Sequence, residues 1–138
     1  IQKGMPCIAE CGGFLYLHRE LEDADGIFYP MAGAIDAKAY RTEKLGRFGY
    51  VTLEAVKDQL LGEKGTFVRG HEFHYWDSEC CGESFCARKP VGKRSWNCVH
   101  GDKTLYAGFP HLFFYSNLKV PCAFLESCRA YGGRICSL

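Results

Sequence analysis

The residue in this chain best suited to act as a nucleophile is Cys11, which stands between a short apolar run and two glycines. The run, residues 6–9, is typical of a strand, and Phe14 begins a pattern typical of the buried side of a helix. A strand–nucleophile–helix turn is so sharp that it needs small residues two positions either side, and Ala9 and Gly13 occupy those positions. We predict a nucleophile elbow in which the helix N-terminus favours the thiolate of Cys11 over the thiol.

Three stretches, in order along the chain, resemble one enzyme family. Residues 9–13, Ala-Glu-Cys-Gly-Gly, resemble the nucleophile turn of class I glutamine amidotransferases, in the branch that amidates corrin rings. Residues 69–75, Arg-Gly-His-Glu-Phe-His-Tyr, are similar to a segment of the cobyrinic acid a,c-diamide synthase family and are the most specific of the three. Residues 105–114 are similar to the segment that carries the catalytic histidine of that family. The resemblance implies an α/β fold of the class I glutamine amidotransferase-like (flavodoxin-like) type, a layered sheet with helices.

The resemblance also implies a reaction and its residues. Cys11 would attack the side-chain carboxamide of glutamine, His111 would move the protons, and the amide N–H of Gly12 would hold the tetrahedral oxyanion. The ammonia would amidate the a and c carboxylates of cobyrinic acid in cobalamin biosynthesis, on a synthetase domain that uses ATP and Mg²⁺. Cobyric acid synthase and nickel-sirohydrochlorin a,c-diamide synthase are the alternatives within the same class.

The polar residues of the middle stretch are expected to border the site or its contact with the synthetase domain. We predict them as substrate-binding residues: Arg69, His71, Glu72 and His74. Many class I members carry a glutamate two positions after the catalytic histidine to orient it, whereas Phe113 stands at that position here and the corrinoid branch also lacks the glutamate. His111 is therefore left without an assigned partner, and Glu72 is one candidate.

Composition limits the other function classes. The formal net charge of +1 gives no indication of a nucleic-acid or membrane-surface partner. No apolar run approaches the roughly 20 residues of a spanning helix and no signal peptide is visible, so we expect a cytoplasmic protein. The expected partners are glutamine and, through the synthetase domain, the corrinoid; a homodimer is left open. No G-x-x-x-x-G-K-[ST] pattern occurs, so ATP and Mg²⁺ are expected only for the full-length enzyme.

Nine cysteines in a chain of 138 residues raise the question of disulfides or metal. The chain has enough apolar residues to fold without disulfides, so we expect most thiols to be reduced, with buried thiols at Cys7, Cys98, Cys122 and Cys136. A structural zinc site is a less favoured alternative, built from Cys80, Cys81, Cys86 and Cys98 with His71, His74 or His100. The absence of a C-x-x-C pair weighs against it, and no metal ligand is predicted. A non-catalytic relative that keeps the fold for subunit association is the third hypothesis.

The remaining patterns predict the elements that position these residues. Strands are expected at residues 27–35, 48–56 and 66–76, with Glu72 and His74 on the opposite face from His71. Helices are expected at residues 13–21 and 118–131, the second capped by Asn117 and stopped by Gly132. We expect a polar connection at 36–47, a surface loop or hairpin at 77–94, and a hairpin over 95–109.

The domain expectation concerns the whole chain. Residues 1–138 are interpreted as one glutamine amidotransferase domain, the C-terminal fragment of a longer enzyme whose synthetase domain and first strands lie outside this sequence. On that interpretation the second oxyanion donor comes from the missing part, and the isolated chain should hydrolyse glutamine poorly.

Overall fold

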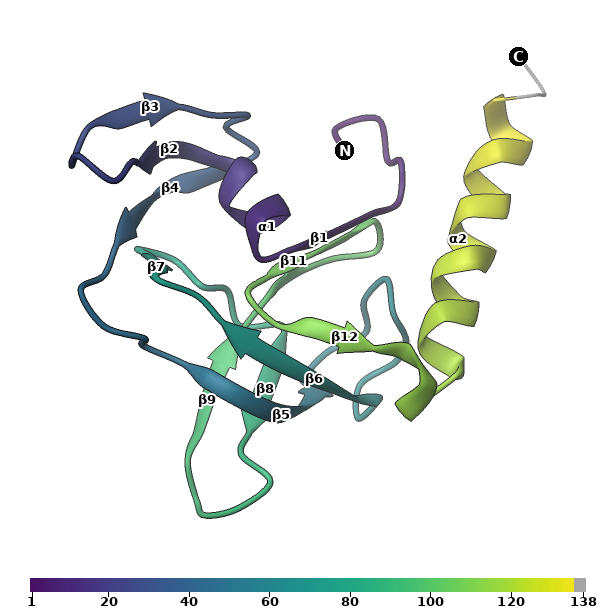
Figure 1. The fold of residues 1–138 in the computed structure, drawn as a ribbon. Helices are drawn as coiled ribbons and strands as arrows, with labels where there is room; N and C mark the ends of the chain where they lie inside the picture. Colours follow the sequence, from purple (N-terminus) through teal and green to yellow (C-terminus); the bar gives the residue numbers. More distant parts are fainter. Residues whose placement is uncertain (136–138) are drawn as a thin grey trace.

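The computed structural model describes residues 1–135, in which many short strands and few helices form an α/β fold (Figure 1). The nucleophile segment belongs to a three-stranded sheet of order β1-β11-β10. Its members are β1 (Cys7–Glu10), β11 (Leu105–Gly108) and β10 (His100–Gly101). β1 runs parallel to β11, with Glu10 opposite Gly108, and β10 runs antiparallel to β11. The predicted strand before Cys11 is confirmed, and it lies directly beside the strand that leads to His111.

A five-stranded antiparallel sheet carries the middle stretch, in the order β12-β6-β5-β8-β9. Its strands are β12 (His111–Phe113), β6 (Phe67–Phe73), β5 (Phe48–Ala55), β8 (Phe85–Arg88) and β9 (Ser95–Cys98). The strands predicted at 48–56 and 66–76 are confirmed as β5 and β6, although β6 ends three residues earlier. His111 pairs with His71 across β12 and β6, so the sheet joins two of the three motifs.

A four-stranded sheet, of order β3-β2-β4-β7, lies beside α1 (Figure 1). It contains β3 (Phe28–Pro30), β2 (His18–Glu22), β4 (Ile35–Arg41) and β7 (Trp76–Ser78). The prediction of a polar connection at 36–47 is wrong for its first part, which is β4. Ile35, Ala37 and Ala39 alternate inward along β4, and the small alanines gave the pattern too little apolar contrast to be recognised as a strand.

The helix after the nucleophile is shorter than predicted. α1 spans only Gly12–Tyr16, and the rest of the predicted helix, to residue 21, is β2 instead. The carbonyl of Phe14 accepts hydrogen bonds from the N–H of Leu17 at 3.1 Å and from His18 Nδ1 at 2.8 Å. These bonds close the helix end, and the following residues pair with β3 and β4.

Three further expectations need correction. The segment 77–94, expected as a surface loop or hairpin, contains β8, which is one arm of a hairpin with β9 but lies in the interior of its sheet. The hairpin prediction over 95–109 holds only for β10 and β11, because β9 pairs with β8. α2 (Lys119–Ile135) begins as predicted, with Asn117 Oδ1 accepting from the N–H of Lys119 at 3.2 Å, but it continues through Gly132.

Two hydrophobic clusters fill the interior, on either side of β11. One contains Leu53, Phe85 and Tyr106 and lies against the five-stranded sheet. The other contains Phe14 and Phe109 and lies under α1. Residues 105–110 are all buried, so the strand leading to His111 is held firmly between the two clusters.

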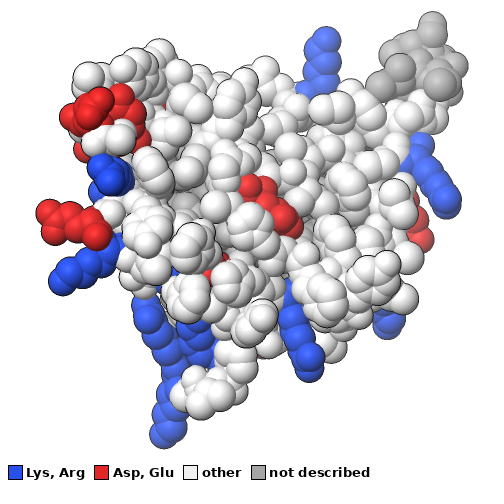
Figure 2. All heavy atoms as spheres, viewed as in Figure 1, with Lys and Arg blue, Asp and Glu red and all other residues white. Residues whose placement is uncertain are grey.

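Most charged side chains lie at the edges of the face seen in Figure 2, and an acidic group lies near its otherwise uncharged middle. Exposed aromatic side chains stand on the strands of the five-stranded sheet or just after it: Phe48, Tyr50, Phe73, Phe113 and Tyr115. Among residues 1–135, no helix has the length and apolar character needed to cross a bilayer.

Candidate active site

Cys11 occupies the turn between β1 and α1 in a conformation that ordinary residues avoid. Its φ is 45° and its ψ is −102°, a strained combination for a residue with a Cβ atom. Its N–H donates to the carbonyl of Gly108 at 2.9 Å, and its carbonyl accepts from the N–H of Leu15 at 2.9 Å. A Cβ atom at Gly13 would lie 3.5 Å from Cβ of Ala9, so the turn leaves little room there. The predicted strand–nucleophile–helix turn is confirmed.

The expectation that the turn favours the thiolate is wrong for this structure. Burial raises the pKa of the Cys11 thiol, and although the backbone N–H of Gly12 lowers that pKa, the nearby carboxylates of Glu10 and Glu72 raise it. A helix of five residues adds little to offset them. Cys11 therefore needs a base to take its proton. The hydrogen bond from Gly12 also places that N–H beside the sulfur, where an oxyanion donor is needed.

His111 has a carboxylate partner, and it is Glu10 rather than Glu72. Nδ1 of His111 lies 3.4 Å from Oε2 of Glu10. Oε1 of the same carboxylate accepts the backbone N–H of Leu112 at 2.9 Å, so both of its oxygens face β12. Because Glu10 directly precedes Cys11, this contact brings the imidazole to the nucleophile turn.

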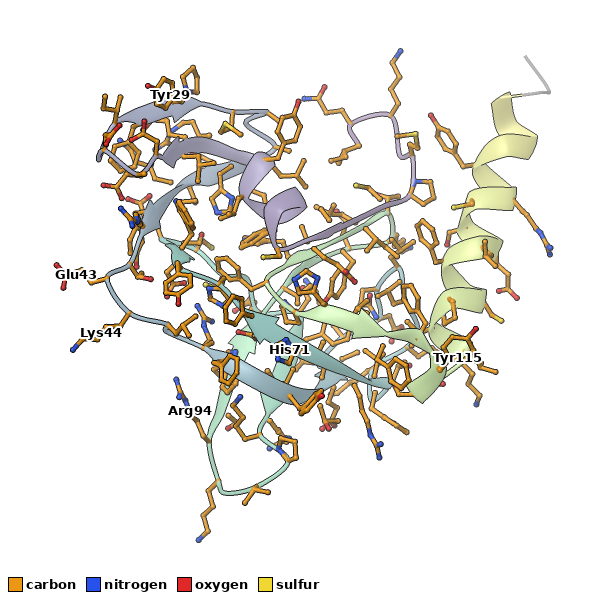
Figure 3. The ribbon with its side chains drawn as sticks, in the orientation of Figure 1. Tyr29, Glu43, Lys44, His71, Arg94 and Tyr115 are labelled. Carbon is orange, nitrogen blue, oxygen red and sulfur yellow. The ribbon has the colours of Figure 1, made fainter. Side chains whose placement is uncertain are left out.

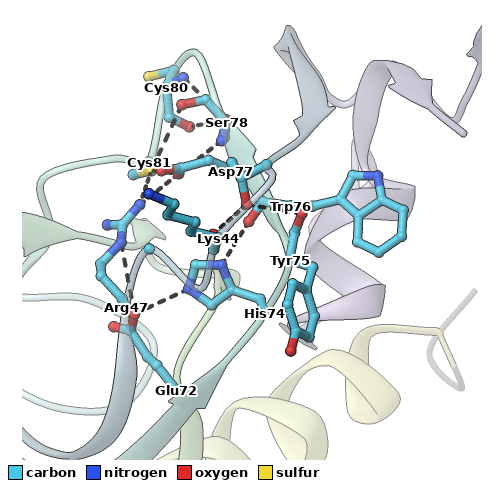
Figure 4. A network of polar contacts seen from close by, with 12 residues as sticks. Lys44, Arg47, Glu72, His74, Tyr75, Trp76, Asp77, Ser78, Cys80 and Cys81 are labelled. Atoms are coloured by element: carbon cyan, nitrogen blue, oxygen red, sulfur yellow. Dashed lines mark hydrogen bonds and ion pairs between the residues drawn. The ribbon is translucent and has the colours of Figure 1, made fainter. Parts of the chain in front are cut away.

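Glu72, the candidate partner from sequence, is fully buried and engaged elsewhere (Figure 4). Its Oε2 lies 3.2 Å from Nε2 of His74 and 3.8 Å from Nε of Arg47. Arg47 continues the network to Asp77 Oδ1 at 2.5 Å and to the sulfur of Cys81 at 3.2 Å. The ring of His74 stacks on Phe109 with centroids 3.8 Å apart. This network lies beneath the segment that leads to His111.

The four predicted substrate-binding residues divide between the two faces of β6. Glu72 and His74 are buried in the network, whereas Arg69 and His71 lie on the open face with His111. A cavity of about 860 Å³ lies there, lined by Tyr50, Arg69, His71, His111, Phe113 and their neighbours. Figure 3 shows His71 on this open side of β6. The cavity is large enough for an amino acid beside His111.

Glu10 is the site residue that sequence reasoning missed. Its one visible signal was a lone acidic residue at the end of an apolar strand, next to the nucleophile. That signal is local, whereas the role depends on a histidine 101 positions away, which only the pairing of β1 with β11 brings into contact.

The cysteines are free thiols within the described residues. Cys98 is buried as predicted and Cys7 is half-buried, whereas Cys122 is exposed on α2, which corrects its expected burial; Cys136 lies outside the described residues. Across residues 1–135, no three side chains of His, Cys, Asp or Glu converge as metal ligands would.

Comparisons with known proteins agree with this geometry. Residues 1–118 match the model of the CobB/CobQ-like glutamine amidotransferase domain. The chain is 37% identical over 134 residues to a cobyrinate a,c-diamide synthase of Caldanaerobacter subterraneus subsp. tengcongensis, covering 96% of this chain and 30% of that protein. Enzymes of the same name from Fusobacterium nucleatum and Thermoplasma volcanium are 36% and 34% identical, over 86% and 95% of this chain. The alignments span 26% and 29% of those two proteins, so the chain is less than a third of the length of these relatives.

Proposed function

The chain belongs to the CobB/CobQ-like glutamine amidotransferase family, and from this premise we propose that it hydrolyses glutamine with Cys11 as nucleophile and His111 as general base and acid. The observation that carries the proposal is the strained turn at Cys11, with the Gly12 N–H on its sulfur and the imidazole of His111 linked to the turn through Glu10. Strained, sharply turned nucleophiles of this kind are a recurring feature of acyl-transfer sites.

The chemistry follows from these groups. Nε2 of His111 takes the thiol proton as the sulfur of Cys11 attacks the carboxamide carbon of glutamine. The resulting oxyanion accepts the N–H of Gly12. Ammonia leaves with the proton that His111 returns to it, and a thioester remains on Cys11. Water, deprotonated by His111, then cleaves the thioester and releases glutamate, and His111 returns that proton to the sulfur of Cys11.

In this proposal the cavity beside His111 holds the amino-acid end of glutamine; Cys11 does not line it, so the carboxamide would extend past His111 to the nucleophile turn. Arg69 and His71 line it and are the better placed of the four predicted residues to contact glutamine. The guanidinium of Arg69 suits the α-carboxylate of an amino acid. Glu72 and His74, both buried, would act from beneath by holding β6 and Phe109 in place.

The proposal also names the molecule that accepts the ammonia. The relatives' name, cobyrinate a,c-diamide synthase, supports cobyrinic acid as the acceptor of the ammonia, with ATP and Mg²⁺ used by the longer enzyme. Amidation of another tetrapyrrole, as in cobyric acid synthase, would leave the residues described above with the same roles.

The test is affinity labelling of the native polypeptide that carries this domain with a diazo ketone analogue of glutamine, followed by peptide mapping. We expect a single label on Cys11, at least about a hundredfold slower labelling in His111→Ala, and no change in the matched control Cys122→Ser, which alters an exposed thiol on α2. Labelling spread over several cysteines, or untouched by the loss of His111, would favour the non-catalytic relative instead.

A further inference from the structure

We infer that Glu10 is the positioning residue of the catalytic histidine, fixing the tautomer and orientation of His111 from the residue directly before the nucleophile. The inference rests on the proposed glutamine hydrolysis and deepens it. It assigns to Glu10 the task that a glutamate two positions after the histidine performs in many class I amidotransferases, a position that Phe113 holds here with its ring half-exposed.

The contacts define which proton arrangement the site favours. Oε2 of Glu10 lies 3.4 Å from Nδ1 of His111, and because a carboxylate only accepts hydrogen bonds, a hydrogen bond between them would place the proton on Nδ1. The neutral imidazole then carries its lone pair on Nε2, the nitrogen needed to receive a proton from a thiol. No hydrogen bond within residues 1–135 engages Nε2 of His111, so it is available for that proton.

The surroundings hold this arrangement in one place. The N–H of Leu112 binds the other oxygen of Glu10, so the carboxylate is fixed to the same strand that carries His111. The turn between β11 and β12 is buried, with the hydroxyl of Tyr106 donating to the carbonyl of Pro110 at 3.3 Å. The Glu10 carboxylate therefore cannot move far from β12 without breaking its hydrogen bond to the N–H of Leu112.

The electrostatics of the site is a second reason to assign this positioning role to Glu10. The negative charge of Glu10 lies beside Cys11 and opposes its ionisation. If the site only had to hold a thiolate, such a charge would destabilise it. It becomes favourable when His111 takes the thiol proton, because an imidazolium then forms in contact with the carboxylate. The position of Glu10 therefore suits a proton transfer from thiol to imidazole better than a preformed thiolate.

The test variant is Glu10→Gln, which keeps the shape of the side chain. Its amide oxygen can still accept the N–H of Leu112, and the NH₂ group then faces Nδ1 of His111, which must lose its proton to accept a hydrogen bond. The tautomer with the proton on Nε2 is the wrong one for a base. We expect kcat for glutamine hydrolysis by the native polypeptide to fall by about 100-fold or more, with KM changed by less than about threefold.

Three comparisons separate this role from a merely structural one. ¹⁵N NMR of His111 should show the proton on Nδ1 in the wild type and on Nε2 in Glu10→Gln. Glu10→Asp, which restores an acceptor on a shorter side chain, should recover part of kcat. The control Glu54→Gln removes the charge from an exposed ion pair with Arg88, between β5 and β8 and outside the cavity lining, and should leave kcat and the tautomer unchanged.

Unchanged kcat or an unchanged His111 tautomer in Glu10→Gln would overturn the inference. A wild type that is neither labelled at Cys11 nor active with glutamine would overturn the proposed function instead. In that case the NMR comparison still decides whether Glu10 sets the tautomer, so the two failures are distinguishable.

Discussion

Glu10–His111 and Glu72–His74 are the same chemical pair in two different environments. Their carboxylate–imidazole distances are similar, 3.4 and 3.2 Å, but the side chains of the first pair are 27% and 49% exposed and those of the second 1% and 3%. In the first pair, whose histidine lines the cavity, no hydrogen bond within the described residues engages Nε2. The second uses both ring nitrogens, since Nδ1 of His74 also donates to the carbonyl of Trp76 at 2.6 Å.

The difference shows why proximity of a glutamate to a histidine says little about catalysis. With Nδ1 of His74 committed as a donor, the contact to Glu72 needs a proton on Nε2 or on the carboxyl group, so no lone pair is left for a substrate. Arg47 and the stacked ring of Phe109 complete the enclosure. The buried pair, Glu72–His74, stabilises the structure beneath the site. The exposed pair, Glu10–His111, can exchange protons with a bound substrate.

The largest effect on stability should come from breaking the buried pair. Glu72→Ala leaves Nε2 of His74 without its partner and Arg47 with one fewer, and we expect the free energy of unfolding to fall by about 3 kcal/mol. Glu10→Ala, the matched variant of the open pair, removes one hydrogen bond and a partly solvated contact and should cost about 1 kcal/mol. Urea denaturation of both variants measures the difference. Equal losses would mean that the two environments do not differ as described.

A smaller loss is expected from crowding the strand pair that connects the two regions. At Gly70 a Cβ atom would lie 2.6 Å from the backbone oxygen of His111, so Gly70→Ala must push β12 away from β6. We expect a loss of about 2 kcal/mol in unfolding free energy, together with slower labelling of Cys11 because His111 shifts.

The matched control for this change is Gly132→Ala, where no atom beyond the adjacent residues and the backbone of α2 lies within 4 Å of the added methyl group. In the interior of α2 it should be neutral or stabilising, by up to about 1 kcal/mol. Thermal unfolding of both variants provides the measurement. If Gly70→Ala behaved like Gly132→Ala, the close packing of β6 against His111 would be refuted.

The smallest effect concerns the charge beside the nucleophile. Because burial and the carboxylates of Glu10 and Glu72 raise the pKa of Cys11, alkylation of the free enzyme by iodoacetamide should increase only at alkaline pH. Glu10→Gln removes one negative charge, so the midpoint of that pH profile should move down, while Glu54→Gln should not move it. If Glu10→Gln is alkylated faster but turns over glutamine more slowly, the effect of Glu10 on ionisation of Cys11 is separate from its effect on the orientation of His111. An upward shift of the midpoint would contradict the stated electrostatics.

Local elements were predictable where side-chain contrast is strong. The strands of the middle stretch carry large aromatic and β-branched residues, and β5 and β6 lie where expected. β4 was missed because its inward positions at Ala37 and Ala39 are small. The end of α1 was misplaced because His18, which closes the helix, also begins a strand that pairs with distant residues. Both β4 and the end of α1 depend on pairing with strands that are distant in the sequence.

The sequence by itself determined the nucleophile turn and the family. Small residues on both sides of Cys11 permit a sharp turn, and because this steric requirement acts over a few residues it can be recognised in the sequence. Tertiary structure alone decided which carboxylate serves His111. The contact between Glu10 and His111 forms only when β1 and β11 pair in parallel and the buried turn at Pro110 redirects the chain. Burial separates Glu72 from the open face of β6, so the glutamate of the segment 69–75 has a structural role beneath the site. Glu10, beside the nucleophile, contacts His111 instead.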